Sequence, residues 1–315
     1  MSMGSHTRVL MRVPPAIPPG GRIAVIAPGS RVQARLLRRG LTLIESWGYE
    51  VVTGPHVFEH NGDLAGDDAA RLADLSWALE SDGIDAVWAA RGGWGSARLL
   101  PQLDLVRLCR RPRWLIGFSD LSSLQAALLT RGIASWHAPL VSDLANKERF
   151  VASDLRRMLE QPLAERVFQP GLRRILIPGR ARGPLAGGCL SLLVGLAGTS
   201  WQPDLNGHVV FLEEVGEAPY RIDRLLWQAR EAGVFEGIRG LVFGQFVACR
   251  PAPGRPSRPL AELLMSFANS LGVPALAGLP CGHGRKARAL PLGYDADLDA
   301  QQGRLTLRPP EVPRR

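Results

Sequence analysis

Short apolar runs alternate with amphipathic segments along the first half of the chain. Four of these runs are typical of buried strands, and they cover residues 22–29, 49–54, 85–93 and 113–118. The segments between and after them are typical of helices, at residues 32–48, 67–81, 96–105 and 120–132. Strands and helices that alternate at this pitch predict a parallel sheet with helices on both faces.

The alternation returns in the second half, after a segment in which the pattern weakens and Gly, Pro and Arg become frequent. Beyond that segment we predict strands at 208–215, 238–246 and 274–280, helices at 220–233 and 260–272, and a terminal hairpin at 295–309. We therefore expect an α/β protein with four parts: a flexible lead-in at 1–20, a Rossmann-like N-terminal domain at 21–146, an interdomain linker region at 147–182 and a smaller C-terminal α/β domain at 183–315.

The composition of the 315 residues is that of a soluble globular protein, with 46% hydrophobic and 21% charged residues. The longest apolar stretches, such as CLSLLVGLAG, have about half the length that a membrane-spanning helix needs. The first residues lack the apolar core of a signal peptide. Four scattered cysteines without a CxxC pair favour reduced thiols in a cytoplasmic protein over disulfides or a zinc site.

The net charge of +9 raises the question of a nucleic-acid partner. Lys147 and Lys286 are the only lysines, and the arginines are spread over the whole chain. The chain also lacks the combined aromatic and basic signature of an RNA-binding sheet. We therefore expect neither nucleic acid nor a membrane as a partner.

A serine stands where an apolar strand stops and a helix begins, in the segment RWLIGFSDLSSLQAALLTRG. Only Ser119 and Asp120 separate the strand-like run from the amphipathic segment. A tight strand-to-helix turn lifts its central side chain clear of the sheet and directs N–H groups of the helix start at the same spot, which suits a nucleophile. Ser and Asp are also preferred as ordinary helix caps, and this segment alone favours the cap.

Three turns rich in glycine or serine follow predicted strands, namely APGSR, RGGWGS and GFSD. Ligands of parallel sheets bind beyond the carboxyl ends of the strands, so the three turns converge on one predicted site. RGGWGS has neither the GxGxxG spacing nor the lysine of a phosphate-binding loop. Gly92 and Gly93 could instead bring free N–H groups close to a substrate, as an oxyanion hole requires.

The segment HVFEH, from His56 to His60, matches the H-x-x-E-H pattern of zinc peptidases. That pattern needs a sustained helix, but Gly54 and Pro55 precede it and Asn61 and Gly62 follow it. We therefore interpret it as a polar loop rather than a metal site.

Two further segments carry side chains that are suited to catalysis. Glu213 and Glu214 end a predicted strand, where adjacent residues point to opposite faces. An ordinary solvated strand end is the alternative for them. His283 lies between two glycines, which indicate unusual dihedral angles or a close approach, although a lone loop histidine is more often a surface residue.

Together these residues form a chemically coherent set in the order Ser, Glu, His. A hydroxyl is a poor nucleophile at neutral pH and needs a neutral imidazole to accept its proton. The imidazole in turn needs an acceptor on its other nitrogen, and a glutamate can serve.

The sequence resembles the LD-carboxypeptidases, a serine peptidase family that includes the microcin C resistance hydrolases. The matching segments run in the family's order between Arg22 and Gly293, and the most specific are ARGGWGSARLLPQLD, LIGFSDLSSLQAAL, VVFLEEVGEAPYRIDRLLWQ and GLPCGHGRKARALPLG. The resemblance implies Ser119 as the nucleophile, Glu213 as the orienting acid and His283 as the general base. It also implies an oxyanion hole from backbone N–H groups, which we place at Asp120 and in the Gly92–Gly93 turn.

The resemblance further implies a homodimer that needs no metal and no other cofactor. We expect a cytoplasmic serine carboxypeptidase that releases the terminal D-Ala from a murein tetrapeptide. Arg91 and Arg221 are candidates for binding the free carboxylate of the substrate, because a guanidinium can bind it through two hydrogen bonds. Structural ion pairs are the alternative for both.

Three positions depart from the family pattern. Trp94 and Phe118 stand where tyrosine is familiar, and Cys189 replaces the usual asparagine of GGNL. Trp94 could stack on a nucleobase. An alternative function is therefore that of a self-immunity hydrolase that cleaves a peptide–nucleotide antibiotic. A catalytically silent ligand-binding protein on the same scaffold is a further alternative.

Overall fold

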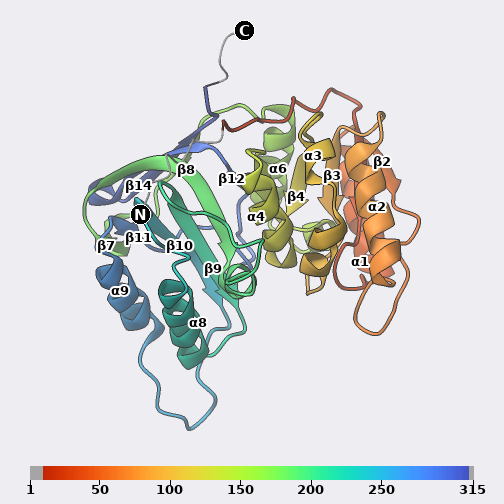
Figure 1. Cartoon of the computed structure of the whole chain (residues 1–315). Coiled ribbons are helices and arrows are strands. Elements are labelled where there is room, and N and C mark those ends of the chain that lie inside the picture. Colours follow the sequence, from red (N-terminus) through yellow and green to blue (C-terminus); the bar gives the residue numbers. More distant parts are fainter. Residues whose placement is uncertain (1–9, 312–315) are drawn as a thin grey trace, which may run out of the picture.

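The computed structural model describes residues 10–311, so the predicted lead-in at 1–20 falls partly outside the described residues. Two sheets form the frame of the molecule, one built mainly from the first half of the chain and one from the second (Figure 1). The predicted α/β class is confirmed.

The first sheet has six strands in the order β12-β5-β4-β3-β1-β2. Its strands are β1 (Arg22–Ile26), β2 (Glu50–Thr53), β3 (Ala86–Ala89), β4 (Trp114–Gly117), β5 (Ser135–His137) and β12 (Leu290–Leu292). Strands β1 to β5 run parallel, whereas β12 runs antiparallel to β5. The helices of this half are α1 (Ala34–Ser46), α2 (Asp68–Glu80), α3 (Leu105–Leu108), α4 (Ser122–Thr130), α5 (Val141–Leu144) and α6 (Arg149–Glu160), with the 3-10 helices η1 (Ser96–Gln102) and η2 (Ser119–Leu121).

Successive residues of β1 belong to two separate apolar clusters, one on each face of the sheet. Ile23 and Val25 share a cluster with Leu37 of α1, while Ala24 and Ile26 share the other with Leu75 of α2. A strand buried on both faces explains why β1 reads as a continuous apolar run rather than an alternating one.

The second sheet has eight strands in the order β6-β14-β13-β8-β9-β10-β11-β7. Its strands are β6 (Arg166–Phe168), β7 (Ile175–Ile177), β8 (Arg180–Cys189), β9 (Val209–Val215), β10 (Gly240–Val247), β11 (Ala275–Leu276), β13 (Asp295–Asp299) and β14 (Arg304–Arg308). Strands β8 to β11 run parallel, and the other pairs are antiparallel. The helices are α7 (Leu190–Val194), α8 (Pro219–Glu231) and α9 (Leu260–Leu271), with the 3-10 helices η3 (Leu172–Arg174) and η4 (Ala300–Gln302).

The segment 147–182, which the sequence predicts as the linker between domains, is largely structured. It forms α6 and contributes β6 and β7 to opposite edges of the second sheet. The predicted terminal hairpin is confirmed as the antiparallel pair β13 and β14.

The chain crosses from one sheet to the other at β12. Leu290 of β12 pairs with His137 of β5, and Leu292 pairs with Ser135. Three residues after Leu292, at Asp295, the chain enters β13 of the second sheet. A strand from the second half therefore completes the first sheet and holds the two halves together.

The strand order of the first sheet reverses between β1 and β3, where the loops after these two strands meet. Ser30 donates its backbone N–H to the carbonyl oxygen of Gly92 at 3.0 Å. Such a reversal point is where ligands bind in open parallel sheets.

One buried arginine joins the end of α2 to the start of β4. Arg113 donates from Nε to the carbonyl oxygen of Ile84 at 2.6 Å and from its terminal nitrogens to those of Leu79 and Ser81. We expect Arg113→Met to lower the free energy of unfolding by about 3 kcal/mol, because three carbonyl groups lose a charged donor. Urea denaturation measures this change.

The neighbouring Arg111 supplies the matched control. Its side chain is 63% exposed and pairs with the exposed Asp82, so Arg111→Met should cost less than about 1 kcal/mol. Equal losses in the two variants would contradict the role given to Arg113.

Candidate active site

Ser119 occupies a strained turn directly after β4. Its φ of 62° is a left-handed value, shared among the non-glycine residues of 10–311 only with Ala248. No side chain caps η2, which begins at Ser119, or the following α4. Ser119 therefore has an energetically unfavourable backbone conformation and does not act as a helix cap. Strained residues of this kind are concentrated at functional sites.

The residue after Ser119 ties this turn to the glycine-rich turn after β3. The carboxylate of Asp120 accepts the backbone N–H of Ser96 at 2.9 Å, and Ser96 Oγ donates to the carbonyl oxygen of Asp120 at 2.7 Å. Asp120 is fully buried, and this burial raises its pKa to about 6. A Cβ on Gly29 would come within 2.2 Å of the Asp120 carboxylate, so the loop that follows β1 also packs closely against this carboxylate.

Gly92 lies directly against the serine side chain. A Cβ at this position would be 3.0 Å from Ser119 Cβ and 3.2 Å from Ser119 Oγ. Gly93 has a φ of 91° and lies close to Ser30, whose Oγ a Cβ would meet at 2.1 Å. The sequence prediction that these glycines allow a close backbone approach agrees with this geometry.

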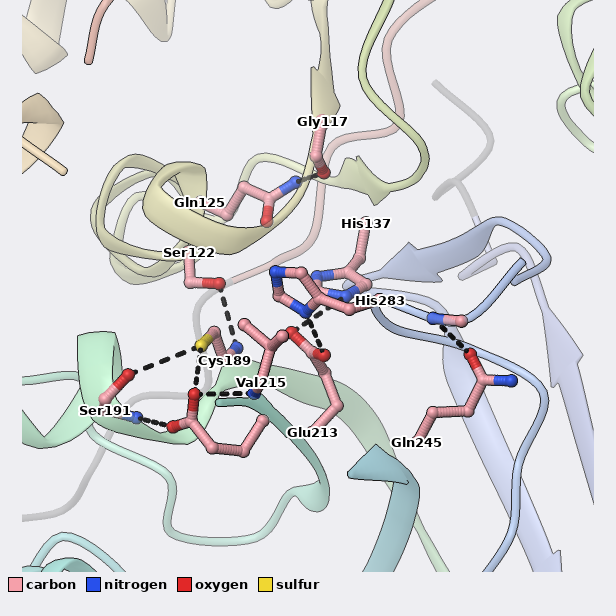
Figure 2. Close-up of polar contacts among 12 residues, drawn as sticks. Gly117, Ser122, Gln125, His137, Cys189, Ser191, Glu213, Val215, Gln245 and His283 are labelled. Carbon is pink, nitrogen blue, oxygen red and sulfur yellow. Dashed lines mark hydrogen bonds and ion pairs between the residues drawn. The ribbon is translucent and has the colours of Figure 1, made fainter. Parts of the chain in front are cut away.

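Glu213 and His283 form a hydrogen-bonded pair (Figure 2). His283 Nδ1 lies 2.7 Å from Glu213 Oε2, and the carboxylate side chain is completely buried while that of the histidine is 15% exposed. Burial raises the pKa of Glu213, and the hydrogen bond to His283 acts in the opposite direction. With the carboxylate ionised, Nδ1 must carry the proton, which leaves Nε2 free to accept one.

Both glycines that flank His283 are needed by the close packing of its loop. Gly282 has a φ of 118°, and a Cβ there would come within 2.6 Å of Glu213 Oε2. Gly284 donates its N–H to Gln245 Oε1 at 3.0 Å, and a Cβ would collide with the same side chain. These contacts confirm the close approach that the Gly-His-Gly sequence predicts.

The adjacent Glu214 serves a different group. It accepts hydrogen bonds from the backbone N–H groups of Ser191 and Val215, each at 2.8 Å, and lies 3.4 Å from the Cys189 sulfur. Glu214 thus anchors the start of α7, and only Glu213 reaches the histidine. Cys189 is fully buried and donates its backbone N–H to Ser122 Oγ at 3.0 Å, so its loop packs against the start of α4.

Ser119 and His283 come from different domains and meet around Phe118. The Phe118 ring, on the residue before the serine, packs against the His283 ring with centroids 4.5 Å apart. No hydrogen bond joins Ser119 to His283 among residues 10–311. Catalytic hydrogen bonds of free enzymes are often long and shorten in the substrate complex.

Two residues near this site were not identified from the sequence. His137 ends β5 with its side chain 1% exposed, and its Nε2 lies 3.8 Å from Glu213 Oε1. Lys147 donates from Nζ to the carbonyl oxygen of Gly284 at 3.0 Å and lies 6.0 Å from the centre of the Phe118 ring. The only available signal for His137 was a polar residue at the end of a buried strand.

The residues predicted to bind substrate lie in more exposed positions. Arg91 donates to the carbonyl oxygen of Arg31 at 2.6 Å, and Arg221 pairs with Glu217 at 3.4 Å. Trp94 is 51% exposed on the glycine-rich turn, with the Arg98 guanidinium 5.8 Å from its ring centre.

The HVFEH segment forms turns rather than a helix. His56 bonds through Nδ1 to the buried Asp74 at 2.7 Å, which anchors the loop to α2. Within residues 10–311, no group of three or more His, Cys, Asp or Glu side chains has the arrangement of a metal site. Over the same range, no helix has the length and apolar character to cross a membrane.

Comparison with known proteins identifies relatives along most of the chain. Residues 23–138 match the LD-carboxypeptidase N-terminal domain, and residues 182–298 match the C-terminal domain of the same family. The murein tetrapeptide carboxypeptidase of Pseudomonas aeruginosa is 34% identical over 295 residues, which are 90% of this chain and 95% of that protein.

Solved structures have the same fold. The muramoyltetrapeptide carboxypeptidase of Oxalobacter formigenes superposes with a TM-score of 0.83 at 29% identity, covering 93% of this chain and all of that one. The microcin C7 self-immunity protein MccF, in complex with aspartyl sulfamoyl adenosine, gives 0.83 at 20% identity over 95% and 98% of the two chains. The chain therefore belongs to the LD-carboxypeptidase family of peptidases.

Proposed function

We propose that this protein is a serine carboxypeptidase that hydrolyses an L,D-peptide bond and releases the terminal D-Ala of a murein tetrapeptide. The observation that carries the proposal is the buried Glu213–His283 pair, which lies beside the strained turn that presents Ser119. The names of the relatives from P. aeruginosa and O. formigenes support the substrate class.

In this mechanism Ser119 Oγ attacks the carbonyl carbon of the L,D bond while His283 Nε2 accepts its proton. Glu213 keeps the proton of the neutral imidazole on Nδ1 and stabilises the imidazolium that forms. The tetrahedral intermediate collapses to an acyl-enzyme when His283 protonates the leaving amine of D-Ala. Water then attacks the ester, with His283 again as the base, and restores the serine.

The negative oxygen of the intermediate needs N–H donors near Ser119. We assign this role to the backbone N–H of Asp120 and to the Gly92–Gly93 turn, where a Cβ on Gly92 would lie only 3.2 Å from Ser119 Oγ. The bonds between Asp120 and Ser96 hold the two turns at a fixed separation. Arg91 and Arg221 stay candidates for the substrate carboxylate.

The alternative is hydrolysis of a peptide–nucleotide conjugate, the activity expected of a self-immunity protein. The exposed Trp94 ring on the rim of the glycine-rich turn is the observation that favours it, because such a ring can stack on a base. The cytoplasmic location and the homodimer also stay predictions.

The substrate assignment is tested with purified protein. We expect mass spectrometry to detect free D-Ala from the tetrapeptide with diaminopimelate or lysine at its third position, and no cleavage of aminoacyl sulfamoyl adenosine. Cleavage of the adenosine conjugate alone would replace the proposal with the alternative. Failure of a serine-directed fluorophosphonate to label Ser119, together with no cleavage of either compound, would indicate a silent binding protein.

Two substitutions at Ser119 separate its chemical role from its strain. We expect Ser119→Ala and Ser119→Gly both to lower kcat by at least about 10⁴-fold, because both remove the nucleophile. Ser119→Gly should be more stable than Ser119→Ala by about 1 kcal/mol, since glycine adopts the positive φ without cost. Thermal unfolding and peptide-release assays measure the two effects, and an active alanine variant would refute the serine mechanism.

A methyl group at residue 92 should block the site. Its Cβ would lie 3.0 Å from Ser119 Cβ, where the oxyanion and its donors have to fit. Gly92→Ala keeps the backbone N–H but crowds the space beside Ser119, and we expect it to lower kcat by about 100- to 1,000-fold, as much as the loss of one oxyanion donor. The unfolding midpoint should change little, and a fully active variant would exclude this turn from the oxyanion hole.

Asp120 predicts a pH-dependent contribution to stability. Because burial raises its pKa to about 6, the folded protein holds a proton here between about pH 4 and pH 6 that the unfolded chain has released. The stabilisation is complete below about pH 4 and is lost as the pH rises through 6, a change of about 3 kcal/mol. Urea denaturation measures this change at pH 4 and at pH 7.5. Between these two pH values, the free energy of unfolding of Asp120→Asn should rise by about 3 kcal/mol relative to that of the wild type. Equal differences between the two proteins at both pH values would contradict the raised pKa of Asp120.

A further inference from the structure

Two buried side chains between the domains carry polar atoms that lack a hydrogen-bond partner among the described residues. These atoms are both ring nitrogens of His137 and Oε1 of Glu213. The side chains are 1% and 0% exposed, and Nε2 of His137 lies 3.8 Å from Oε1. Figure 2 shows the His137 ring beside Glu213 and His283.

Leaving a buried polar group unpaired costs about 1–3 kcal/mol, and more for a charged group. Here an unpaired nitrogen faces an unpaired carboxylate oxygen across a gap about 0.8 Å longer than an ordinary hydrogen bond. A small decrease in the distance between His137 Nε2 and Glu213 Oε1 would give both atoms a hydrogen-bond partner. The nitrogen has to be the donor, because an imidazole lone pair would repel the carboxylate.

Aromatic neighbours fix the orientation of the His137 ring. It packs edge-on against Phe118, with centroids 5.7 Å apart, and against Phe211, with centroids 5.1 Å apart. Phe118 precedes Ser119, and Phe211 lies two residues before Glu213 on β9. The His137 ring therefore packs between Phe118, which precedes the nucleophile Ser119, and Phe211, which lies on the same strand as Glu213.

The charged and titratable groups around the carboxylate come from several elements. They are His283 and Cys281 from the loop after β11, His137 from β5, Lys147 after α5, Cys189 from β8, Glu214 from β9 itself and Cys249 after β10. Burial and the charge of His283 lower the pKa of His137 to about 3, which favours the neutral ring near neutral pH. A neutral His137 ring can donate a hydrogen bond to the Glu213 carboxylate. Because it carries no positive charge, it does not compete with His283 as the ion-pair partner of this carboxylate.

We infer that His137 is a positioning residue that donates a hydrogen bond from Nε2 to Glu213 Oε1, so that each oxygen of this carboxylate is held by a different histidine. His283 holds Oε2 from the second domain, and His137 holds Oε1 from the end of β5 in the first. The carboxylate is thereby fixed in orientation and favoured in its ionised form. This inference rests on the proposed role of Glu213 in orienting His283.

The test compares substitutions that remove or retain the donor. His137→Phe keeps an aromatic ring but has no N–H, whereas His137→Gln places an amide N–H near the position of Nε2. We expect His137→Phe to lower kcat at least about 10-fold with little change in KM, and to move the acidic limb of kcat/KM to higher pH. His137→Gln should recover most of the rate and the wild-type limb.

Ser135 provides the matched control. It lies two residues earlier on β5, is 1% exposed and has a hydroxyl that is also unpaired among residues 10–311. Ser135→Ala should leave both rate and pH profile unchanged. If His137→Phe behaves like Ser135→Ala, or if His137→Gln is no better than His137→Phe, the inference is wrong.

Labelling of Ser119 by a fluorophosphonate gives a readout that does not depend on the substrate. The labelling rate of His137→Phe should fall and shift with pH in the same way as kcat/KM. Wild-type protein that is labelled but releases no D-Ala would overturn the proposed substrate and leave the inference on His137 standing.

A measurement on the wild-type protein covers the case in which the phenylalanine variant does not fold. Nitrogen-15 spectra of histidine-labelled protein should show His137 as a neutral ring protonated on Nε2. A ring protonated on Nδ1, or one that titrates between pH 5 and pH 8, would overturn the inference.

Discussion

The pairing of β12 with β5 is the interaction on which the site depends. Ser119 follows β4 of the first sheet, whereas Glu213 lies near the end of β9 of the second and His283 lies in the loop that leads into β12. Because β12 forms an antiparallel ladder with β5, the histidine loop is tied by backbone hydrogen bonds to the strand beside β4. The domain interface is thus a shared sheet, which is stiffer than a contact between side chains.

Burial at this interface gives the site its electrostatic character. Glu213 has no exposed surface, and removing a carboxylate from water disfavours its charge unless donors replace the lost water. The chain supplies the Nδ1–H of His283 at 2.7 Å, and Gln245 fixes the loop that carries this histidine. The same burial lets the carboxylate act strongly on the imidazole, because few water molecules screen the interaction.

The sequence predicts the elements that depend on local pattern better than the contacts that depend on tertiary structure. Its periodicity indicates strands β1 to β4 of the first sheet and β9 to β11 of the second, the serine turn after β4 and the hairpin of β13 and β14. It does not indicate that β6 and β7 join the second sheet, because short strands in a Gly- and Pro-rich segment gain their stability from edge pairing. It also misses β12 as a strand of the first sheet, since no local pattern specifies a partner that lies about 150 residues earlier in the chain.

The same difference explains which site residues could be identified from the sequence. Ser119 and His283 stand in turns whose glycine and serine content is unusual by itself. His137 and Lys147 acquire their environments through tertiary contacts, among them those with Glu213 and Gly284. We infer that residues of the second kind act on the reacting groups indirectly, through the position of the Glu213 carboxylate and of the His283 loop. A histidine carboxylate pair at 2.7 Å is useful for catalysis only if it cannot move away from the serine. The aromatic packing of Phe118 against both histidines provides that restraint, because it couples the position of the serine turn to the rings on either side of Glu213.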